Sequence, residues 1–306
     1  MLLALCLPLV ACNPWQSGRL KVSLSDWPGY EFINMAVAKG FIPNAEMVSL
    51  TDQSEVVRSY LRGELDVVQL TTVDVLDICS KRPSQCPVIV LVLNESLGGD
   101  QIMSLKLRGI DELAGSKVAV APSSFGPYVL HKALETSGLT IDDLSIVPML
   151  VSEMPEALST DVVDAAVLYP PNSEQIRAYG GRTIFDSSVI PGQILDVLAV
   201  SPSVYASRKK DVSLFVDGWF KAHLYASDHA SSAIPFMASN QGLTPDEFKE
   251  ALSGMFFALN VDHQRKMLAS EGDLSVNIDS VSQLMKGMNL HRDKAPSPHI
   301  SADFLP

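Results

Sequence analysis

The sequence predicts an α/β protein in which mixed, mostly parallel β-sheets are flanked by helices. Short apolar runs rich in β-branched residues alternate with amphipathic helical segments in both halves of the chain, as is typical of parallel sheets. With 306 residues, the chain is long enough for two lobes that each bury a large core. Residues 111–139 show the repeating unit most clearly, because they hold a turn, a buried strand, a polar loop and a helix.

The strand of this unit is the apolar run KVAVA at residues 117–121. The helix after it has Ser123 or Ser124 as its N-cap, and Gly138 stands where a C-cap glycine belongs. The loop between strand and helix therefore offers backbone N–H groups and hydroxyls at the carboxyl end of the strand. Ligands of open α/β sheets bind at such ends, so we expect this loop to contact a ligand.

The other elements follow from the same two periodicities. Strands are predicted at residues 20–24, 45–50, 66–70, 88–93, 144–148, 164–168, 182–185 and 197–200. Helices bounded by Ser, Thr or Gly are predicted at residues 31–39, 54–61, 73–79, 152–158 and 173–178. Beyond Pro202 the chain is mostly helical, at residues 213–227, 230–239, 244–252, 261–269 and 278–288. The proline-containing tail from His291 is expected to be loosely held.

Residues 94–100 (NESLGGD) are predicted to cross between the lobes. Gly98 and Gly99 lie between two buried runs and give the backbone the freedom that a hinge requires. A simple hairpin turn is the alternative interpretation of this segment.

Charge and motifs exclude several functions. The formal net charge is -12 and no run of Lys or Arg could neutralise successive phosphates, which argues against a nucleic-acid partner. The sequence has no H-E-x-x-H, no G-x-S-x-G and no glycine-rich phosphate loop, and its six histidines show no metal-ligand spacing. We therefore expect no catalysis, no metal site and no cofactor.

The N-terminus favours export. Residues 1–11 (MLLALCLPLVA) are apolar but too short to span a bilayer, and they lead to Cys12. The end of this run resembles the lipobox of bacterial lipoproteins, in which the cysteine is lipidated after residues 1–12 act as the signal segment. No Lys or Arg precedes the run, so the true start could lie upstream of Met1. The alternative is the start of a buried strand or helix.

Two cysteines would remain after export, Cys79 and Cys86, on either side of a polar loop. Their separation of seven residues predicts a local disulfide in an oxidising compartment, and two free thiols are the alternative. No histidine lies nearby, which disfavours a metal site.

Several short motifs, in this order and spacing, identify a family. They are Gly29-Tyr30 with Ala36 and Gly40, residues 63–66 (GELD), 111–117 (DELAGSK), Gly138-Leu139, and 163–167 (VDAAV) before Pro170. From residue 20 to about 200 the chain resembles the periplasmic solute-binding proteins of ABC importers. The branch is the NMT1/THI5-like one, which serves nitrate, sulfonates, taurine and the thiamin pyrimidine precursor.

The resemblance implies the two-lobe periplasmic-binding-protein fold of type II. Lobe 1 would comprise residues 13–97 and 199–306, lobe 2 residues 98–198, and the hinge residues 94–100 and 196–202. The protein would be a monomer, periplasmic or on the outer face of the cytoplasmic membrane, and held there by a lipid on Cys12. It would deliver a small molecule to an ABC permease. A sensor subunit that signals to a membrane receptor is the alternative, and an enzyme on the same fold is a further one.

Loops at the carboxyl ends of the strands would line the cleft in such a fold. These candidate ligand-binding residues are Asp26, Trp27, Tyr30, Gln69, Thr71, Thr72, Asp100, Ser123, Ser124, Phe125, Tyr169 and Asp196. The aromatic side chains offer flat walls for a planar or methylene-bearing ligand, although Phe125 could equally be plain core.

Carboxylates discriminate among ligands. Asp26, Asp100, Asp186 and Asp196 fall beside predicted loops or crossings, whereas a sulfonate or nitrate site would require Arg, Lys or clustered N–H donors. An amine or pyrimidine-like ligand therefore fits better. In the alternative, Asp186 and Asp196 cap turns, and the N–H groups at Ser123 and Ser124 hold an anion.

Overall fold

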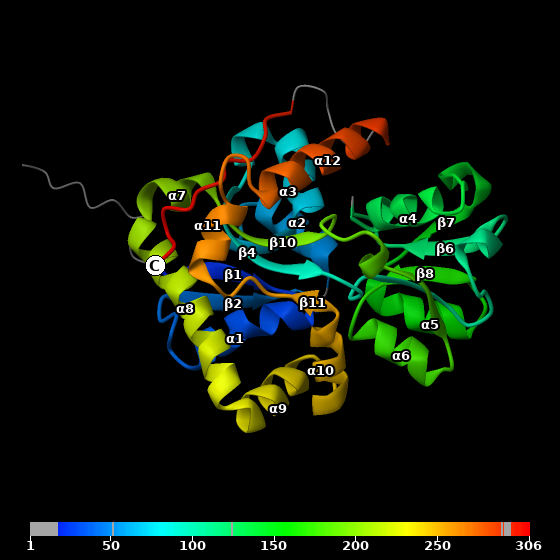
Figure 1. Cartoon of the computed structure of the whole chain (residues 1–306), viewed down its shortest axis with the longest axis horizontal. Helices are drawn as coiled ribbons and strands as arrows, with labels where there is room; N and C mark the ends of the chain where they lie inside the picture. The colour runs from blue at the N-terminus through cyan, green and yellow to red at the C-terminus, as the bar shows by residue number, and fades with distance from the viewer. Residues whose placement is uncertain (1–17, 51, 124, 289, 291–294) are drawn as a thin grey trace, which may run out of the picture.

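Two mixed β-sheets, each flanked by helices, form the two lobes of the molecule (Figure 1). The computed structural model describes residues 18–50, 52–123, 125–288, 290 and 295–306. The strand order is β11-β4-β10-β3-β1-β2 in the first sheet and β7-β6-β8-β5-β9 in the second. The predicted α/β class with two lobes is confirmed.

The first lobe contains both the early and the late parts of the chain. Its strands are β1 (Leu20–Leu24), β2 (Ala45–Ser49), β3 (Val67–Thr71), β4 (Val88–Ser96), β10 (Leu195–Val200) and β11 (Met255–Phe256). Its early helices are α1 (Glu31–Ala38), α2 (Gln53–Leu61) and α3 (Thr72–Lys81). Its late helices are α7 (Pro202–Ser207), α8 (Lys209–Asp228), α9 (Ala230–Asn240), α10 (Pro245–Ser253), α11 (Val261–Met267) and α12 (Asp273–Gly287).

The second lobe is one continuous segment. Its strands are β5 (Gln101–Ser104), β6 (Lys117–Val120), β7 (Ser145–Pro148), β8 (Ala165–Leu168) and β9 (Arg182–Asp186). Its helices are α4 (Phe125–Glu135), α5 (Met154–Ser159) and α6 (Asn172–Ala178). The strand–loop–helix unit predicted at residues 111–139 is β6 followed by α4, and Gly138 takes the positive φ of 71° that a residue without Cβ adopts freely.

Both sheets are mixed because strands that cross between lobes run against their neighbours. β1 pairs in parallel with β2 and β3, whereas β10 is antiparallel to β3 and β4. In the second sheet, β6 is parallel to β7 and β8, and β5 is antiparallel to β8 and β9. The carboxyl ends of β1, β3 and β8 lead into the loops that carry the candidate site.

The lobes are joined by two adjacent crossings, at residues 97–100 and 187–194. Ser187 links them, since its Oγ accepts a hydrogen bond from the backbone N–H of Gly98 at 2.7 Å and its N–H donates to the carbonyl of Asp100 at 2.9 Å. The first crossing lies within the predicted 94–100. The second precedes the predicted 196–202, because β10 from Leu195 onward is already paired in the first sheet.

Three local features differ from or refine the sequence prediction. Asp52, and not Ser54, caps α2 by accepting from the N–H of Glu55, and Thr71, rather than the equally possible Thr72, caps α3 by accepting from the N–H of Asp74. The end of the tail is not loosely held, because the carbonyl of His299 accepts from Ile89 in β4. Phe304, only 4% exposed, packs into the core of the first lobe.

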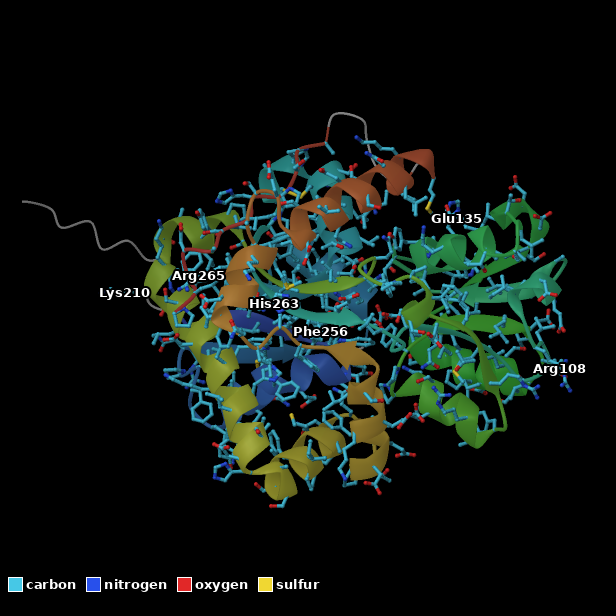
Figure 2. All side chains as sticks on the ribbon, in the orientation of Figure 1. Arg108, Glu135, Lys210, Phe256, His263 and Arg265 are labelled. Atoms are coloured by element: carbon cyan, nitrogen blue, oxygen red, sulfur yellow. A yellow bond between two sulfur atoms is a disulfide. The ribbon has the colours of Figure 1, made fainter. Side chains whose placement is uncertain are left out.

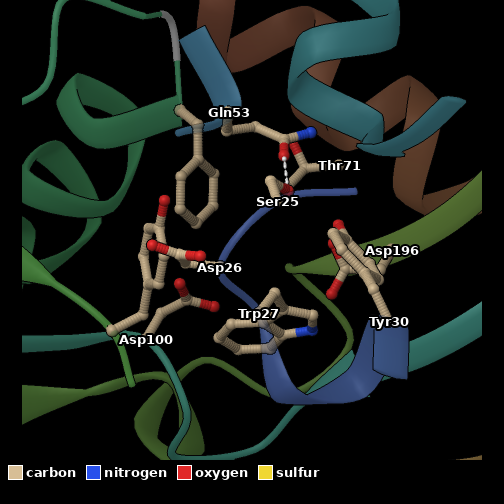
Figure 3. Close-up of a pocket in the computed structure, with 10 residues that line it drawn as sticks. Ser25, Asp26, Trp27, Tyr30, Gln53, Thr71, Asp100 and Asp196 are labelled. Carbon is tan, nitrogen blue, oxygen red and sulfur yellow. Dashed lines mark hydrogen bonds between the residues drawn. The ribbon is translucent and has the colours of Figure 1, made fainter. Parts of the chain in front are cut away.

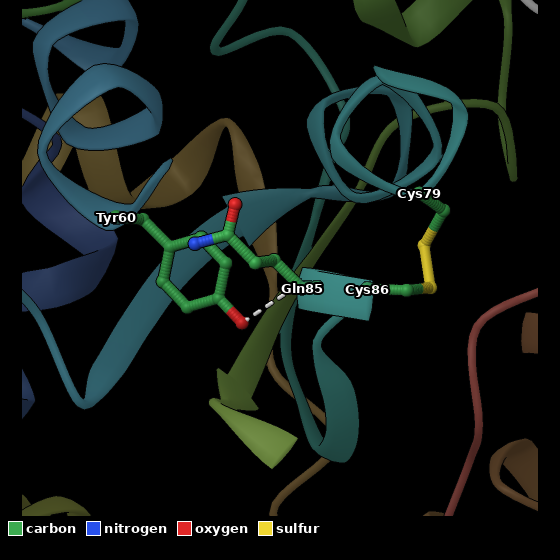
Figure 4. Close-up of a disulfide and its surroundings, with 4 residues drawn as sticks. All are labelled: Tyr60, Cys79, Gln85 and Cys86. Atoms are coloured by element: carbon green, nitrogen blue, oxygen red, sulfur yellow. Dashed lines mark hydrogen bonds between the residues drawn. A yellow bond between two sulfur atoms is a disulfide. The ribbon is translucent and has the colours of Figure 1, made fainter. Parts of the chain in front are cut away.

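The predicted disulfide between Cys79 and Cys86 is present (Figure 4). It links the end of α3 to the short loop that precedes β4. Beside it, the hydroxyl of Tyr60 donates to the carbonyl of Gln85 at 2.9 Å, which joins α2 to the same loop. The predicted lipidation site Cys12 lies outside the described residues.

Candidate functional site

A small cavity lies between the lobes and is lined by both of them (Figure 3). Its volume is about 20 Å³, room for one water-sized molecule. From the first lobe, the cavity is lined by the loop after β1, the starts of α1 and α2, the end of β3 and the start of β10. From the second lobe, it is lined by the end of the first crossing, the start of α4 and the residue after β8. The lining residues are Ser25, Asp26, Trp27, Tyr30, Gln53, Thr71, Asp100, Phe125, Tyr169 and Asp196.

The structure brings eight of the predicted site residues to this cavity: Asp26, Trp27, Tyr30, Thr71, Asp100, Phe125, Tyr169 and Asp196. Ser123 lines an adjoining cavity of about 10 Å³, which shares Asp100, Phe125 and Tyr169 with the first. Ser124 lies outside the described residues.

Two predicted residues lie elsewhere. Gln69 is buried below the cavity, where its Oε1 accepts from the hydroxyl of Ser23 at 3.0 Å. The hydroxyl of Thr72 donates to Asn277 in α12 at 2.7 Å. Gln69 lies on the same face of β3 as Thr71 but two residues earlier, next to Ser23 of β1, whereas Thr72 is already the first residue of α3 and points toward α12.

Sequence reasoning missed Ser25 and Gln53. The hydroxyl of Ser25 donates to the Oε1 of Gln53 at 3.2 Å, and the Nε2 of Gln53 donates to the carbonyl of Gln69 at 2.8 Å. Ser25 directly follows a predicted strand, so its position was a usable signal. Gln53 had none, because its place depends on α2 starting before the predicted Ser54.

Aromatic rings form the walls. The ring of Trp27 packs edge-on against that of Tyr169, with centroids 5.7 Å apart, and lies 6.4 Å from that of Tyr30. Trp27 occupies a slot between two glycines. A Cβ on Gly29 would lie 2.8 Å from the indole Nε1, and a Cβ on Gly99 would lie 2.6 Å from its Cη2. The two glycines thus fix the position of the indole.

Buried carboxylates face these rings. Burial raises the pKa of Asp100 to about 7, and a side-chain hydrogen bond from Ser96 opposes the shift. Burial also raises the pKa of Asp196, although the hydroxyl of Tyr30 donates to its Oδ1 at 2.7 Å. The pKa of Asp26 is raised by burial and by the charge of Asp52. Desolvated carboxylates of this kind gain most from a ligand that brings positive charge or N–H donors.

Several buried polar atoms around the cavity have no hydrogen-bond partner among the described residues. Two belong to lining residues, the Nε1 of Trp27 and the Oδ2 of Asp52, and a third is the Oδ1 of Asp74 in the first turn of α3, which follows the lining residue Thr71. Such atoms are costly in a protein interior unless something satisfies them, so their clustering beside the cavity favours a polar ligand there.

Cations are absent from the described lining of both cavities, which contains no Lys, Arg or His. Figure 2 shows Arg108 at the outer end of the second lobe, and Lys210 and Arg265 at the outer end of the first. Arg177 lines a separate groove beside the crossings, where it bonds to Glu174 and Gln101. The described residues contain no cluster of His, Cys, Asp and Glu suited to a metal ion.

None of the described helices is long and apolar enough to cross a membrane. The sequence has no match among curated proteins. Residues 88–233 match the model of the family described as NMT1/THI5 like, a span that holds β4, the crossings and the whole second lobe.

Solved structures match over nearly the full chain. The alkanesulfonate-binding protein SsuA from Xanthomonas axonopodis pv. citri, bound to MOPS, is 13% identical with a TM-score of 0.75 over 92% of this chain and 96% of that one. A Candida albicans protein with the generic periplasmic binding protein fold is 14% identical with a TM-score of 0.72, over 93% and 98%.

The same fold also hosts catalysis. The desulfurization enzyme DSZB is 17% identical to this chain with a TM-score of 0.65, over 94% of this chain and 95% of that one. At these identities the similarity concerns the fold. The chain therefore has the periplasmic-binding-protein fold, and its residues 88–233 are similar to the NMT1/THI5-like family.

Proposed function

We propose that this chain is an extracytoplasmic solute-binding protein that captures a small molecule between its lobes and delivers it to an ABC importer. The observation that carries the proposal is the interlobe cavity, whose aromatic walls and carboxylates come from both lobes. Since neither lobe holds the complete set, binding is coupled to closure about the crossings at residues 97–100 and 187–194.

Export is supported by the Cys79–Cys86 disulfide, because such bonds persist in oxidising compartments. The role of Cys12 as a lipid anchor remains part of the proposal, as does a monomeric state. An ABC permease is the proposed partner, by likeness to the sulfonate-binding proteins that share the fold. In a sensor, the same closure would instead signal to a membrane receptor.

The ligand is proposed to be an amine or a pyrimidine-like compound. Several solved structures of similar fold bind sulfonates. In this chain, however, Asp26, Asp100 and Asp196 line the cavity without a described cation among them, and a sulfonate would meet like charge. Ring N–H or ammonium donors would pair with these carboxylates, and the rings of Trp27 and Tyr169 would cover the apolar part.

A thermal-shift screen of the purified protein against amines, pyrimidines, sulfonates, nitrate and amino acids tests this proposal. A ligand that binds the folded form raises the melting temperature by mass action, and calorimetry then gives its affinity. We expect shifts with amines or pyrimidines and none with sulfonates. A shift with sulfonates or nitrate alone would contradict the ligand class, and turnover of a stabilising compound would indicate an enzyme.

A further inference from the structure

The carboxylates around the cavity form two groups on either side of Trp27. Asp26 and Asp100 lie on one side of the indole, and Asp196 with Tyr30 lies on the other (Figure 3). Asp52 belongs with the first pair, because it lines the adjoining cavity together with Asp100 and Tyr169. We call Asp26, Asp52 and Asp100 the Tyr169 group.

The second group is formed by Asp74 and Asp196, which we call the Tyr30 group. Tyr30 donates its hydroxyl to Asp196, and the Oδ2 of Asp74, in the first turn of α3, accepts from the hydroxyl of the cavity residue Thr71 at 2.8 Å. Burial and then the charges of Asp196 and Asp74 raise the pKa of Tyr30. After burial, the charges of Asp52, Asp100, Asp26 and Asp74, in this order, raise the pKa of Tyr169. The charge of Asp100 also raises the pKa of Asp196, so the two groups act on each other.

Each group also holds an acceptor with no described partner. In the Tyr169 group it is the Oδ2 of Asp52, whose residue is 3% exposed, and in the Tyr30 group it is the Oδ1 of Asp74, whose residue is 1% exposed. Asp52 lines the adjoining cavity, so its free acceptor is available to a donor at that end, and at the other end Asp196 lines the cavity itself. One compact ammonium ion could pair with one group only.

We propose that the site takes a short diamine, with one ammonium at the Tyr169 group, the other at the Tyr30 group, and the methylene linker against the face of Trp27. This inference rests on the proposed solute-binding function and narrows its ligand class. The two ammonium groups would neutralise the charge of the two groups of buried carboxylates, because the described lining of the cavities contains no Lys, Arg or His that does so. An indole face accommodates methylenes and adjacent ammonium groups.

The size of the site limits the linker. The two adjoining cavities have volumes of about 20 and 10 Å³, so the lobes must part by a small amount even for a slender chain. A branched or bulky cation would require a wider separation of the lobes than an unbranched one. We therefore expect an unbranched linker of few carbons.

Calorimetry on the full protein at pH 7.5 tests the proposal. The probes are the α,ω-diamines from ethane-1,2-diamine to pentane-1,5-diamine, each matched to the monoamine and the amino alcohol of equal length. We expect one diamine to bind at least about tenfold more tightly than its two matched compounds, because the second ammonium adds a charge-assisted hydrogen bond. Equal affinities across a matched set would overturn the proposal.

Variants assign the two ends. Asp100→Asn and Asp196→Asn each remove one carboxylate, and each should abolish most of the preference for the diamine over the monoamine. Asp142→Asn, on the exposed surface of the second lobe, is the matched control and should keep that preference. A diamine preference unchanged in both site variants would contradict the placement. If a variant fails to fold, the wild-type series still decides the ligand class.

The two levels of the proposal fail differently. Binding of a pyrimidine or a sulfonate without any diamine preference would overturn the diamine inference and leave the solute-binding function standing. Failure of every compound class in the broader screen to bind would count against the solute-binding function itself.

Discussion

At the scale of single residues, the position of the Trp27 indole depends on two glycines beside it, Gly29 and Gly99, which have no Cβ. Gly99 leaves room for the indole, and a Cβ there would lie 2.6 Å from Cη2. Gly99→Ala should therefore displace the ring and weaken ligand binding by about 1–3 kcal/mol, although Gly99 itself does not line the cavity. Calorimetric titration with the best ligand of the screen measures the effect.

The matched control is Gly287→Ala, at the end of α12, where a Cβ would meet nothing within 4 Å. It should leave affinity unchanged. If Gly99→Ala binds as tightly as the wild-type protein, the indole does not form a wall of the ligand site.

At the scale of elements, strands and helices with strong periodicity were predictable. The apolar run at residues 88–93 is the core of β4, and the unit at 111–139 is β6 with α4. Two strands were not predictable. β5 (Gln101–Ser104) directly follows the glycines of a crossing, and β11 (Met255–Phe256) is two residues long and exists through its pairing with β4. Tertiary pairing, not local propensity, specifies them.

The disulfide belongs to this scale, since it fastens one end of α3. It closes a short loop, with a sequence separation of seven residues, so removing it should lower the free energy of unfolding by about 2–3 kcal/mol. The double variant Cys79→Ser/Cys86→Ser, compared with the wild-type protein with and without reductant in urea unfolding, measures this loss. Ligand affinity should persist, because the cavity lies at the opposite end of α3, at Thr71. Loss of binding in the folded double variant would show that the bond supports the site.

At the scale of the whole molecule, the sequence could place residues at strand ends but could not place one lobe against the other. Asp26 and Tyr169 were predictable as loop residues of separate lobes, and the structure brings both to one cavity. Gln69 and Thr72 show the limit of such reasoning, because Gln69 lies one step too deep in β3 and Thr72 points away from the cavity at the start of α3. The five carboxylates near the cavity were likewise not predictable as a set, because Asp52 and Asp74 owe their positions to the starts of α2 and α3.

This concentration of carboxylates should make stability depend on pH. Burial raises the folded-state pKa of Asp74 and Asp100 to about 7, from 3.8 in an exposed carboxyl. Between pH 3.8 and pH 7 the folded protein retains protons that the unfolded chain has released. The stabilising contribution of these two carboxyl groups is therefore present in full below pH 3.8 and is lost as the pH rises through 7. His223 acts in the opposite sense, because burial lowers its pKa to about 3 and its contribution therefore grows up to its unfolded value of 6.5.

The variant Asp100→Asn isolates the carboxylate effect, because His223 is common to both proteins. Relative to the wild-type protein, the free energy of unfolding of this variant should rise by about 1–3 kcal/mol between pH 5 and pH 8. Urea unfolding without added ligand, at both pH values, gives the comparison. A constant difference between the two proteins would mean that Asp100 is not desolvated in the folded state. The charge that lowers stability at high pH is the charge that the proposed cationic ligand would neutralise.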